Sequence, residues 1–228
     1  MKILKSILIL SFIFLIKLEI MAQEKLLYLA LGDSYTIGEA VDADKAWPKL
    51  LSDKLNQRGI DVHLEEIIAK TGWTTDELLV AIDKNDSLNK TNYDLVSLLI
   101  GVNNQFRGYG FQQYQEEFEL LLKKAITLAG NKVNKVFVVS IPDYGITPFA
   151  SENNKNSDLI ENELYRYNSI AKNISDQYGV RFFDIMPISQ KAIWRDDFVA
   201  KDKLHPSAKM YAEWVEYIEA GVFQLLNK

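Results

Sequence analysis

The sequence of 228 residues predicts an α/β fold in which a parallel β-sheet is covered on both faces by helices. Short apolar runs rich in Val, Ile and Phe alternate with longer segments whose apolar residues recur every three or four positions. This strand-then-helix alternation occurs five times, and no internal repeat, low-complexity segment or linker divides the chain. A single domain built on five parallel strands is therefore expected.

Each predicted element follows from one of these two patterns. The apolar runs predict strands over Leu26–Leu31, Val62–Ala69, Leu95–Ile100, Lys135–Ile141 and Val180–Phe183. The periodic segments predict helices over Trp47–Gln57, Thr74–Ile82, Phe111–Ala129, Ile160–Tyr178 and Met210–Leu225. Gly130 and Gly179 stand where glycine ends a helix, and Thr74 with Glu77 has the spacing of a capping box.

The composition excludes several classes of protein. With 48% hydrophobic and 25% charged residues, the chain resembles an ordinary globular protein. It has no cysteine, which excludes disulfides, thiol catalysis, thiolate metal sites and a lipid-modified cysteine anchor. Lys and Arg form no cluster, so we expect no nucleic-acid partner.

The first residues differ from the rest of the chain. Lys2 and Lys5 precede an uncharged run over residues 6–16, which is shorter than the roughly 20 residues that a membrane span needs. The pattern predicts a secretory signal peptide over 1–22 and one domain over 23–228, with no stable membrane span after cleavage. An uncleaved anchor is the alternative. Removing the leader, whose net charge is +2, changes the net charge from −5 to −7 and leaves an acidic, secreted or periplasmic protein.

Polar residues follow the predicted strands at the points where the strands end. Ser34 comes directly after the first strand, Gly72 after the second and Asn103 after the third. Asp202 and His205 follow the fifth strand by some twenty residues. Because the carboxyl ends of parallel strands share one edge of a sheet, and ligands bind there, we expect these residues to converge.

These residue types together fit nucleophilic catalysis. A serine hydroxyl is a weak nucleophile until a base takes its proton, and His205 is available as that base for Ser34. Asp202, three residues earlier, can fix the tautomer of the imidazole. The side-chain amide of Asn103 and the backbone N–H groups of Ser34 and Gly72 can form an oxyanion hole, in which one donor typically contributes about 2.7–4 kcal/mol.

Each motif alone also has a structural explanation as a turn or a helix cap. Their joint occurrence, each after its own strand, favours catalysis. His63 lies in a predicted strand without a partner and is interpreted as structural.

The irregular stretch 142–158 is interpreted as a functional loop or mobile lid. Aromatic residues lie on the same loops, and the following are expected to line a substrate pocket: Trp73, Phe106, Tyr144 and Trp194.

Four segments resemble the sequence blocks of the GDSL or SGNH hydrolases. They are "LALGDSYTIGEAV", "AKTGWTT", Gly101-Val102-Asn103-Asn104 and "DKLHPS", and the resemblance extends from residue 27 to about 210. It implies a flavodoxin-like three-layer α/β/α sandwich with strand order 2-1-3-4-5. It also implies ester or thioester hydrolysis through an acyl-serine, without metal or organic cofactor, by the residues already named. Asn104 replaces the usual aspartate of its block, which puts the support of that loop in doubt.

The motifs leave the substrate open. The family acts on lipids, lysophospholipids, thioesters and acetylated carbohydrates, so we expect a small-molecule acyl ester of a carbohydrate or lipid. Acyl transfer at the same site and a degenerate esterase that only binds ligand are alternatives. So is a flavodoxin-like module that binds flavin phosphate, although acidic Asp33 beside Ser34 disfavours a phosphate. The sequence does not give the oligomeric state.

Overall fold

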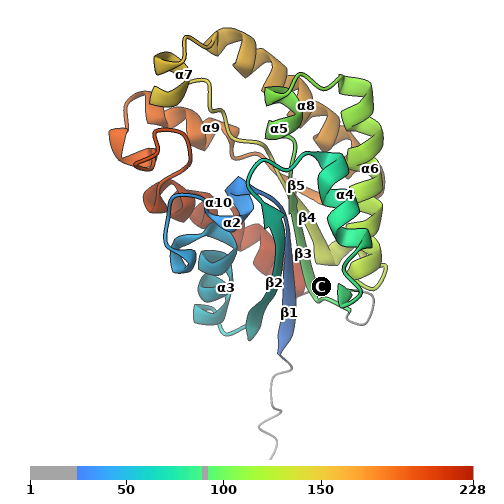
Figure 1. The fold of residues 1–228 in the computed structure, drawn as a ribbon. Helices are drawn as coiled ribbons and strands as arrows, with labels where there is room; N and C mark the ends of the chain where they lie inside the picture. Colours follow the sequence, from blue (N-terminus) through green and yellow to red (C-terminus); the bar gives the residue numbers. More distant parts are fainter. Residues whose placement is uncertain (1–24, 89–91, 228) are drawn as a thin grey trace, which may run out of the picture.

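The computed structural model describes residues 25–88 and 92–227. Its centre is a five-stranded parallel sheet of order β2-β1-β3-β4-β5, which confirms the predicted fold and strand order (Figure 1). The strands are β1 (Leu26–Asp33), β2 (Val62–Lys70), β3 (Leu95–Leu99), β4 (Val136–Val139) and β5 (Arg181–Phe183). The predicted signal peptide, residues 1–22, lies entirely outside the described residues.

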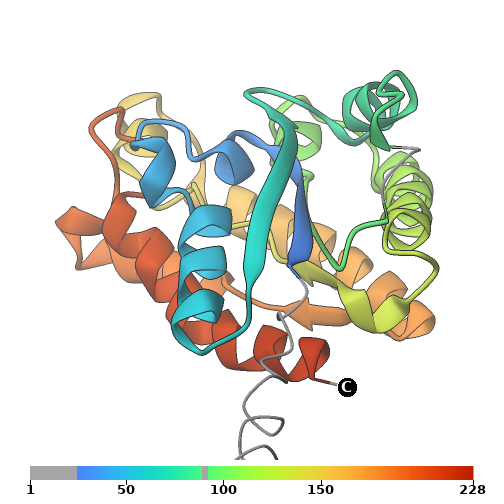
Figure 2. The same ribbon diagram turned by 90° about the horizontal axis from the view of Figure 1, so that it is seen from below.

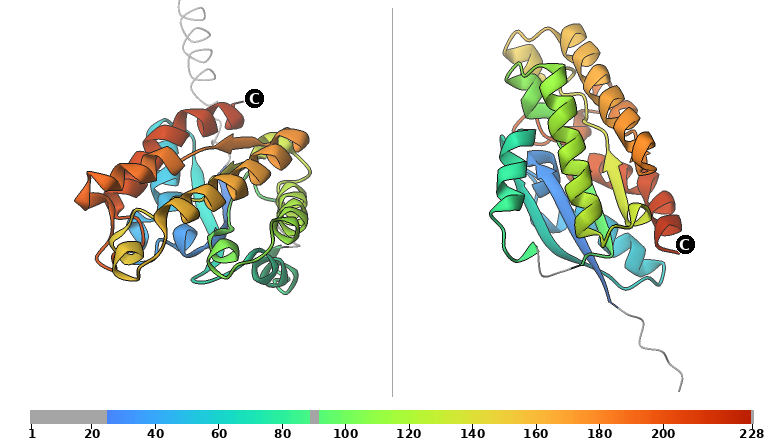
Figure 3. Two further views of the ribbon diagram at one scale, coloured as in Figure 1. Left: turned by 90° about the horizontal axis from the view of Figure 1, so that it is seen from above. Right: turned by 90° about the vertical axis from the view of Figure 1, so that its right-hand side faces the viewer.

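Two layers of helices enclose the sheet. Helices α3 (Trp47–Gln57) and α10 (Ala208–Leu226) contact each other on one face (Figure 2). The other face is covered by α4 (Thr75–Asp83), α6 (Phe111–Leu128) and α8 (Ser157–Tyr178), which lie in front of the sheet in the right-hand view of Figure 3. The structure is therefore the three-layer sandwich that the sequence predicts.

The five long helices begin and end within three residues of their predicted bounds. Gly179 ends α8 with φ +70° and Gly130 follows α6 with φ +66°, both in the left-handed region that glycine adopts at helix ends. Glu77 accepts a hydrogen bond from the backbone N–H of Thr74 at 3.0 Å, as the capping box requires.

Short elements were not predicted, because an apolar period needs more than one turn of helix to be recognised. They are α2 (Ser34–Ile37), α5 (Val102–Phe106), α7 (Pro148–Glu152), α9 (Met186–Ser189) and the 3-10 turns η1 (Ala43–Lys45), η3 (Val133–Lys135), η4 (Gln190–Ile193) and η5 (Asp196–Phe198). Several of these short elements surround the carboxyl edge of the sheet (Figure 1).

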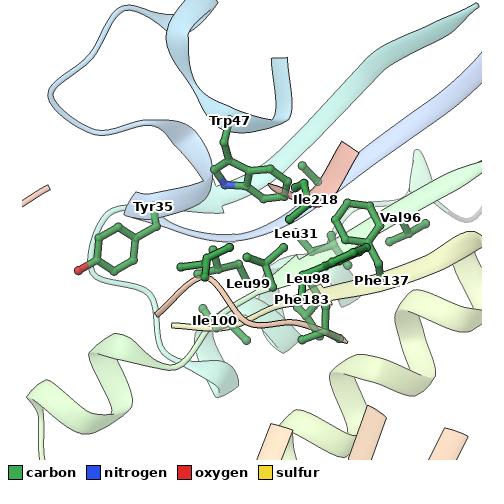
Figure 4. Packing of buried hydrophobic residues seen from close by; sticks show 14 of the residues in the cluster. Leu31, Tyr35, Trp47, Val96, Leu98, Leu99, Ile100, Phe137, Phe183 and Ile218 are labelled. Carbon is green, nitrogen blue, oxygen red and sulfur yellow. The ribbon is translucent and has the colours of Figure 1, made fainter. Parts of the chain in front are cut away.

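Buried hydrophobic side chains pack against both faces of the sheet. All five residues of β3 are buried, and Trp47 packs edge-on against Phe137 with ring centroids 6.3 Å apart (Figure 4). Phe137 in turn packs edge-on against Phe183 at 5.8 Å. This packing fixes the strands whose ends carry the polar residues.

His63 lies on the edge strand β2, opposite Leu27 at the start of β1, so it is at the amino end of the sheet. Its side chain is 52% exposed and lies 3.6 Å from Glu65, in keeping with a structural residue. Between residues 25 and 227, leaving out 89–91, no helix is both long enough and apolar enough to cross a bilayer.

Candidate active site

Ser34 is the first residue of α2 and follows β1 without an intervening loop. Asp33 caps this short helix, because its Oδ1 accepts a hydrogen bond from the backbone N–H of Tyr35 at 3.0 Å. The turn depends on Gly32, where a Cβ would lie 2.1 Å from Oγ1 of Thr36 and 2.4 Å from the carbonyl oxygen of Leu99. A glycine therefore lets the chain leave the strand tightly and place a serine at the carboxyl edge.

The structure brings Ser34, His205 and Asp202 together. His205 Nε2 lies 3.0 Å from Ser34 Oγ, and His205 Nδ1 lies 2.5 Å from Asp202 Oδ2. Asp202 Oδ1 accepts hydrogen bonds from the backbone N–H groups of Leu204 and His205, each at 3.0 Å. Partial burial acts to raise the pKa of Asp202, but these hydrogen bonds outweigh it and lower the pKa below its usual value. The carboxylate is thus ionised and oriented toward the imidazole.

The loop that carries Asp202 and His205 is fixed at both ends. Val199 and Pro206 form an antiparallel bridge, and the backbone N–H of Ala200 donates to the His205 carbonyl at 2.8 Å. Beyond it, Ser207 caps α10 by accepting a hydrogen bond from the backbone N–H of Met210 at 3.3 Å. The imidazole therefore stands on a rigid turn directly before the last helix.

Asn103 lines the same cavity as Ser34, whereas Gly72, on the loop after β2, is not part of that lining. Asn103 Nδ2 donates a hydrogen bond to the Trp73 carbonyl at 2.9 Å, which fixes the direction of the amide and uses one of its two N–H groups. Gly72 has φ +86°, a conformation that favours glycine. Its carbonyl accepts a hydrogen bond from Arg107 Nη2 at 2.5 Å. Helix α5 and the segment after it thereby hold the loop after β2 in place.

A cavity of about 100 Å³ opens beside the serine. It is lined by Ser34, Tyr35, Val102, Asn103, Phe106, Tyr144, Phe149, Leu204 and His205. The stretch 142–158, predicted to be a functional loop or lid, contributes Tyr144 and Phe149 to this lining.

Two of the four aromatic residues expected in the pocket, Phe106 and Tyr144, line the cavity, and two do not. Trp194 follows η4 and is 69% exposed, and Trp73 supports the site through its carbonyl group while its side chain packs against the core. Sequence spacing does not fix the direction of a loop side chain, which is why these two were misplaced.

Outside the predicted stretch 142–158, three residues of the lining were not predicted. Tyr35, Val102 and Leu204 each stand next to a predicted site residue in the sequence, and that adjacency is the only signal that marks them. In the part of the chain that the structure describes, no three or more His, Asp or Glu side chains are grouped to hold a metal ion.

Comparison with known proteins identifies a family. Residues 30–213 match the family described as GDSL-like Lipase/Acylhydrolase. The chain belongs to this family. An arylesterase of Vibrio mimicus is 32% identical over 127 residues, which are 54% of this chain and 59% of that relative. The match thus spans less than two thirds of the relative's length.

Solved structures share the fold of this GDSL-like chain. The psychrotrophic esterase EstA from Pseudoalteromonas sp. is 22% identical, with a TM-score of 0.64 over 89% of this chain and 99% of that one. The Clostridium thermocellum family 3 carbohydrate esterase is 20% identical, with a TM-score of 0.66 over 90% and 100%.

Asn104, where this GDSL-like chain departs from the usual aspartate of its block, is fully buried. Its Oδ1 accepts a hydrogen bond from the backbone N–H of Thr75 at 3.1 Å, and its Nδ2 donates to Thr75 Oγ1 at 2.6 Å. The Thr75 hydroxyl in turn donates to Glu117. The doubt about loop support is therefore answered, because the amide holds the start of α4 with both of its polar atoms.

Asp33, beside the serine of this GDSL-like site, is fully buried. Burial raises the pKa of its carboxyl to about 7, although hydrogen bonds from the backbone N–H groups of Tyr35 and Gly101 act to lower it. Within the described residues, its Oδ2 has no hydrogen-bond partner. A buried oxygen without a donor disfavours the charged form, so a substantial fraction of Asp33 is protonated near neutral pH, whereas Asp202 is ionised.

Proposed function

We propose that this chain is a carboxylic-ester hydrolase that works through an acyl-serine intermediate. The observation that carries the proposal is the continuous chain of contacts from Ser34 Oγ through His205 to Asp202, at 3.0 Å and 2.5 Å. This is the arrangement of nucleophile, base and orienting carboxylate that serine hydrolases use. Membership of the GDSL-like Lipase/Acylhydrolase family supports the same chemistry.

The first half-reaction transfers the acyl group to the enzyme. Ser34 Oγ bonds to the ester carbonyl carbon while its proton passes to His205 Nε2, and the carbonyl oxygen takes the negative charge. The tetrahedral intermediate then breaks its bond to the alcohol oxygen. The alcohol leaves with the proton from His205 Nε2, and Asp202 stabilises the imidazolium in between.

The second half-reaction releases the acid. Water bonds to the acyl carbon and gives a proton to His205 Nε2. The bond between this carbon and Ser34 Oγ breaks, and Oγ recovers the proton. In both steps the oxyanion faces the remaining N–H of Asn103 and the backbone N–H groups of Ser34 and Gly72, which we assign as its donors.

Support for a substrate class comes from the family and its members. One relative is named an arylesterase and one solved neighbour a carbohydrate esterase. We propose acyl esters of a small carbohydrate or lipid alcohol as substrates. Thioesters and lysophospholipids are the alternatives, and direct hydrolysis assays on those compounds would detect them. Acyl transfer is distinguished from hydrolysis by product analysis with a sugar or glycerol acceptor present.

The decisive test compares Ser34→Ala with Ser169→Ala, a change at an exposed serine of α8. EstA was crystallised as inhibited by monoethylphosphonate, so a fluorophosphonate is a suitable probe here. We expect wild type and Ser169→Ala to be labelled and to hydrolyse p-nitrophenyl acetate. Ser34→Ala should fold, resist labelling and lose roughly six orders of magnitude in kcat. Turnover at the wild-type rate in Ser34→Ala would refute the proposal.

We further propose that the protein is exported. The support is the sequence of its first 22 residues, a basic start followed by a short apolar run. N-terminal sequencing of the protein recovered from the secreted or periplasmic fraction should begin near Gln23. Recovery only in the cytoplasm, with Met1 retained, would contradict export and leave the enzymatic proposal untouched.

A further inference from the structure

We propose that the cavity beside Ser34 holds the acyl part of the ester and restricts it to about two to four carbons, with Phe106 closing its outer end. The inference rests on the proposed ester hydrolysis and adds a substrate class to it. Four observations support it: the volume of the cavity, the side chains that line it, the contacts of Phe106, and the order of the two half-reactions.

The cavity is small. Its volume is about 100 Å³. An apolar cavity of about 150 Å³ is enough to bind benzene, and pockets for drug-sized ligands measure roughly 300–1,000 Å³. A short aliphatic group fits the available space. A fatty acyl chain exceeds this volume, so its further carbons gain no burial in the cavity.

The lining beyond the catalytic groups suits an apolar group. The lining includes the polar side chains to which we assign the reaction: Ser34, Asn103 and His205. The other lining side chains are aromatic or aliphatic. Tyr144 is 4% exposed, and its hydroxyl donates to Gln105 Oε1 at 2.8 Å. The proton of this hydroxyl is therefore already bonded, and a sugar ring placed here would face mainly apolar side chains, which cannot replace its hydrogen bonds to water.

Phe106 is held at the rim of the cavity. It is 49% exposed, yet its ring packs against Tyr144 with centroids 6.0 Å apart and against Phe149 at 6.5 Å. Lys155 Nζ lies 4.7 Å from the centroid of the same ring, in a cation–π contact. Phe106, the last residue of α5, thus contacts α7 and the segments on either side of it. These contacts hold the side chain that we propose closes the cavity.

The two half-reactions decide which part of the ester occupies the cavity. The alcohol departs after the first step and water takes its place, so the alcohol side needs a path to solvent next to His205. The acyl group stays bonded to Ser34 through both steps. A small, largely apolar space is compatible with the group that stays and incompatible with the one that must be exchanged.

The test measures kcat/KM for p-nitrophenyl acetate, butyrate, octanoate and decanoate with wild type and Phe106→Ala. Wild type should favour acetate or butyrate over decanoate by about tenfold or more, since a pocket discriminates by about 10–200-fold per misfit carbon. Phe106→Ala should raise the decanoate-to-acetate ratio by at least about tenfold. Trp194→Ala, an exposed aromatic outside the cavity, should leave the ratio unchanged. Phe106→Trp should narrow the cavity and lower kcat/KM for butyrate relative to that for acetate.

A second series keeps the acetyl group and varies the alcohol. Phe106→Ala should leave the ranking of phenyl, naphthyl and ethyl acetate unchanged. The inference is overturned if wild type prefers decanoate, or if the Phe106 variants change the alcohol ranking and leave the acyl ranking as it was. If wild type hydrolyses none of these esters and is not labelled at Ser34, the proposed function itself fails, which is a different result from hydrolysis with the wrong chain length.

Discussion

The rings of Tyr35 and His205 pack edge to face, with their centroids 5.6 Å apart and their planes at 65°. Tyr35 is 3% exposed and follows Ser34 in the same short helix α2. One turn of helix therefore supplies both the proposed nucleophile and the ring that limits the orientation of its base.

Removing the Tyr35 ring should weaken catalysis through this contact. We expect Tyr35→Ala to lower kcat about 10–100-fold, because a displacement near 1 Å of a catalytic group can cost about 100-fold. Tyr35→Phe keeps the ring and should stay close to wild type in kcat. Steady-state kinetics on p-nitrophenyl acetate across pH 6–9 checks both variants. Equal losses in the two would assign the effect to the hydroxyl and not to ring packing.

Asp202→Asn should impair His205 as a base, because the substitution removes the carboxylate that orients the imidazole. An amide N–H facing His205 Nδ1 favours the wrong tautomer, and kcat should fall by about 10⁴-fold while the protein remains folded. Asp197→Asn is the matched control, since that carboxylate pairs with Arg195 and Lys209 on the surface. The measurement is kcat together with the rate of fluorophosphonate labelling. A kcat for Asp202→Asn within tenfold of wild type would contradict the assigned role.

Asn103→Ala should remove an oxyanion donor. We expect a loss of about 10²–10³ in kcat with little change in KM, since the donor acts on charge that develops in the transition state. Asn162→Ala, at an exposed asparagine of α8, should leave both constants unchanged. A rise in KM with kcat preserved would place Asn103 in substrate binding instead.

Asp33→Asn should change how stability depends on pH. The pKa of Asp33 is about 7 in the folded protein, against 3.8 for an unperturbed aspartate. Between these values the unfolded chain releases a proton that the folded chain retains, so the stabilising effect of the protonated carboxyl is present below pH 3.8 and is lost as pH rises to 7. The difference corresponds to roughly 4 kcal/mol.

The asparagine variant keeps the cap acceptor and cannot ionise. Its free energy of unfolding should therefore be close to that of wild type near pH 4 and exceed it at pH 8. Urea denaturation of both proteins at several pH values provides the comparison. Parallel curves over this range would show that Asp33 does not carry the pH dependence.

The sequence predicts the sheet, the long helices and the contact between Ser34 and His205 for one reason. Each rests on a pattern that is local in the chain, combined with the rule that parallel strands end at one edge. Helices α5 and α7 have five residues each, too few for a period to be seen, yet they carry Asn103, Phe106 and Phe149. The composition of the cavity could therefore be predicted only in part, because spacing does not tell whether a loop side chain faces the cavity, as Phe106 does, or turns toward water, as Trp194 does.

Ser34 and His205 are 171 positions apart in the chain. The first belongs to the opening strand–helix turn, and the second stands directly before α10, the helix that rests on α3. Ester cleavage would then appear during refolding only once the closing segment has docked onto the opening one. The return of turnover would therefore report the rate of this last docking step. A chain that ends before residue 199 contains the sequence of all five strands but lacks His205, the proposed proton acceptor.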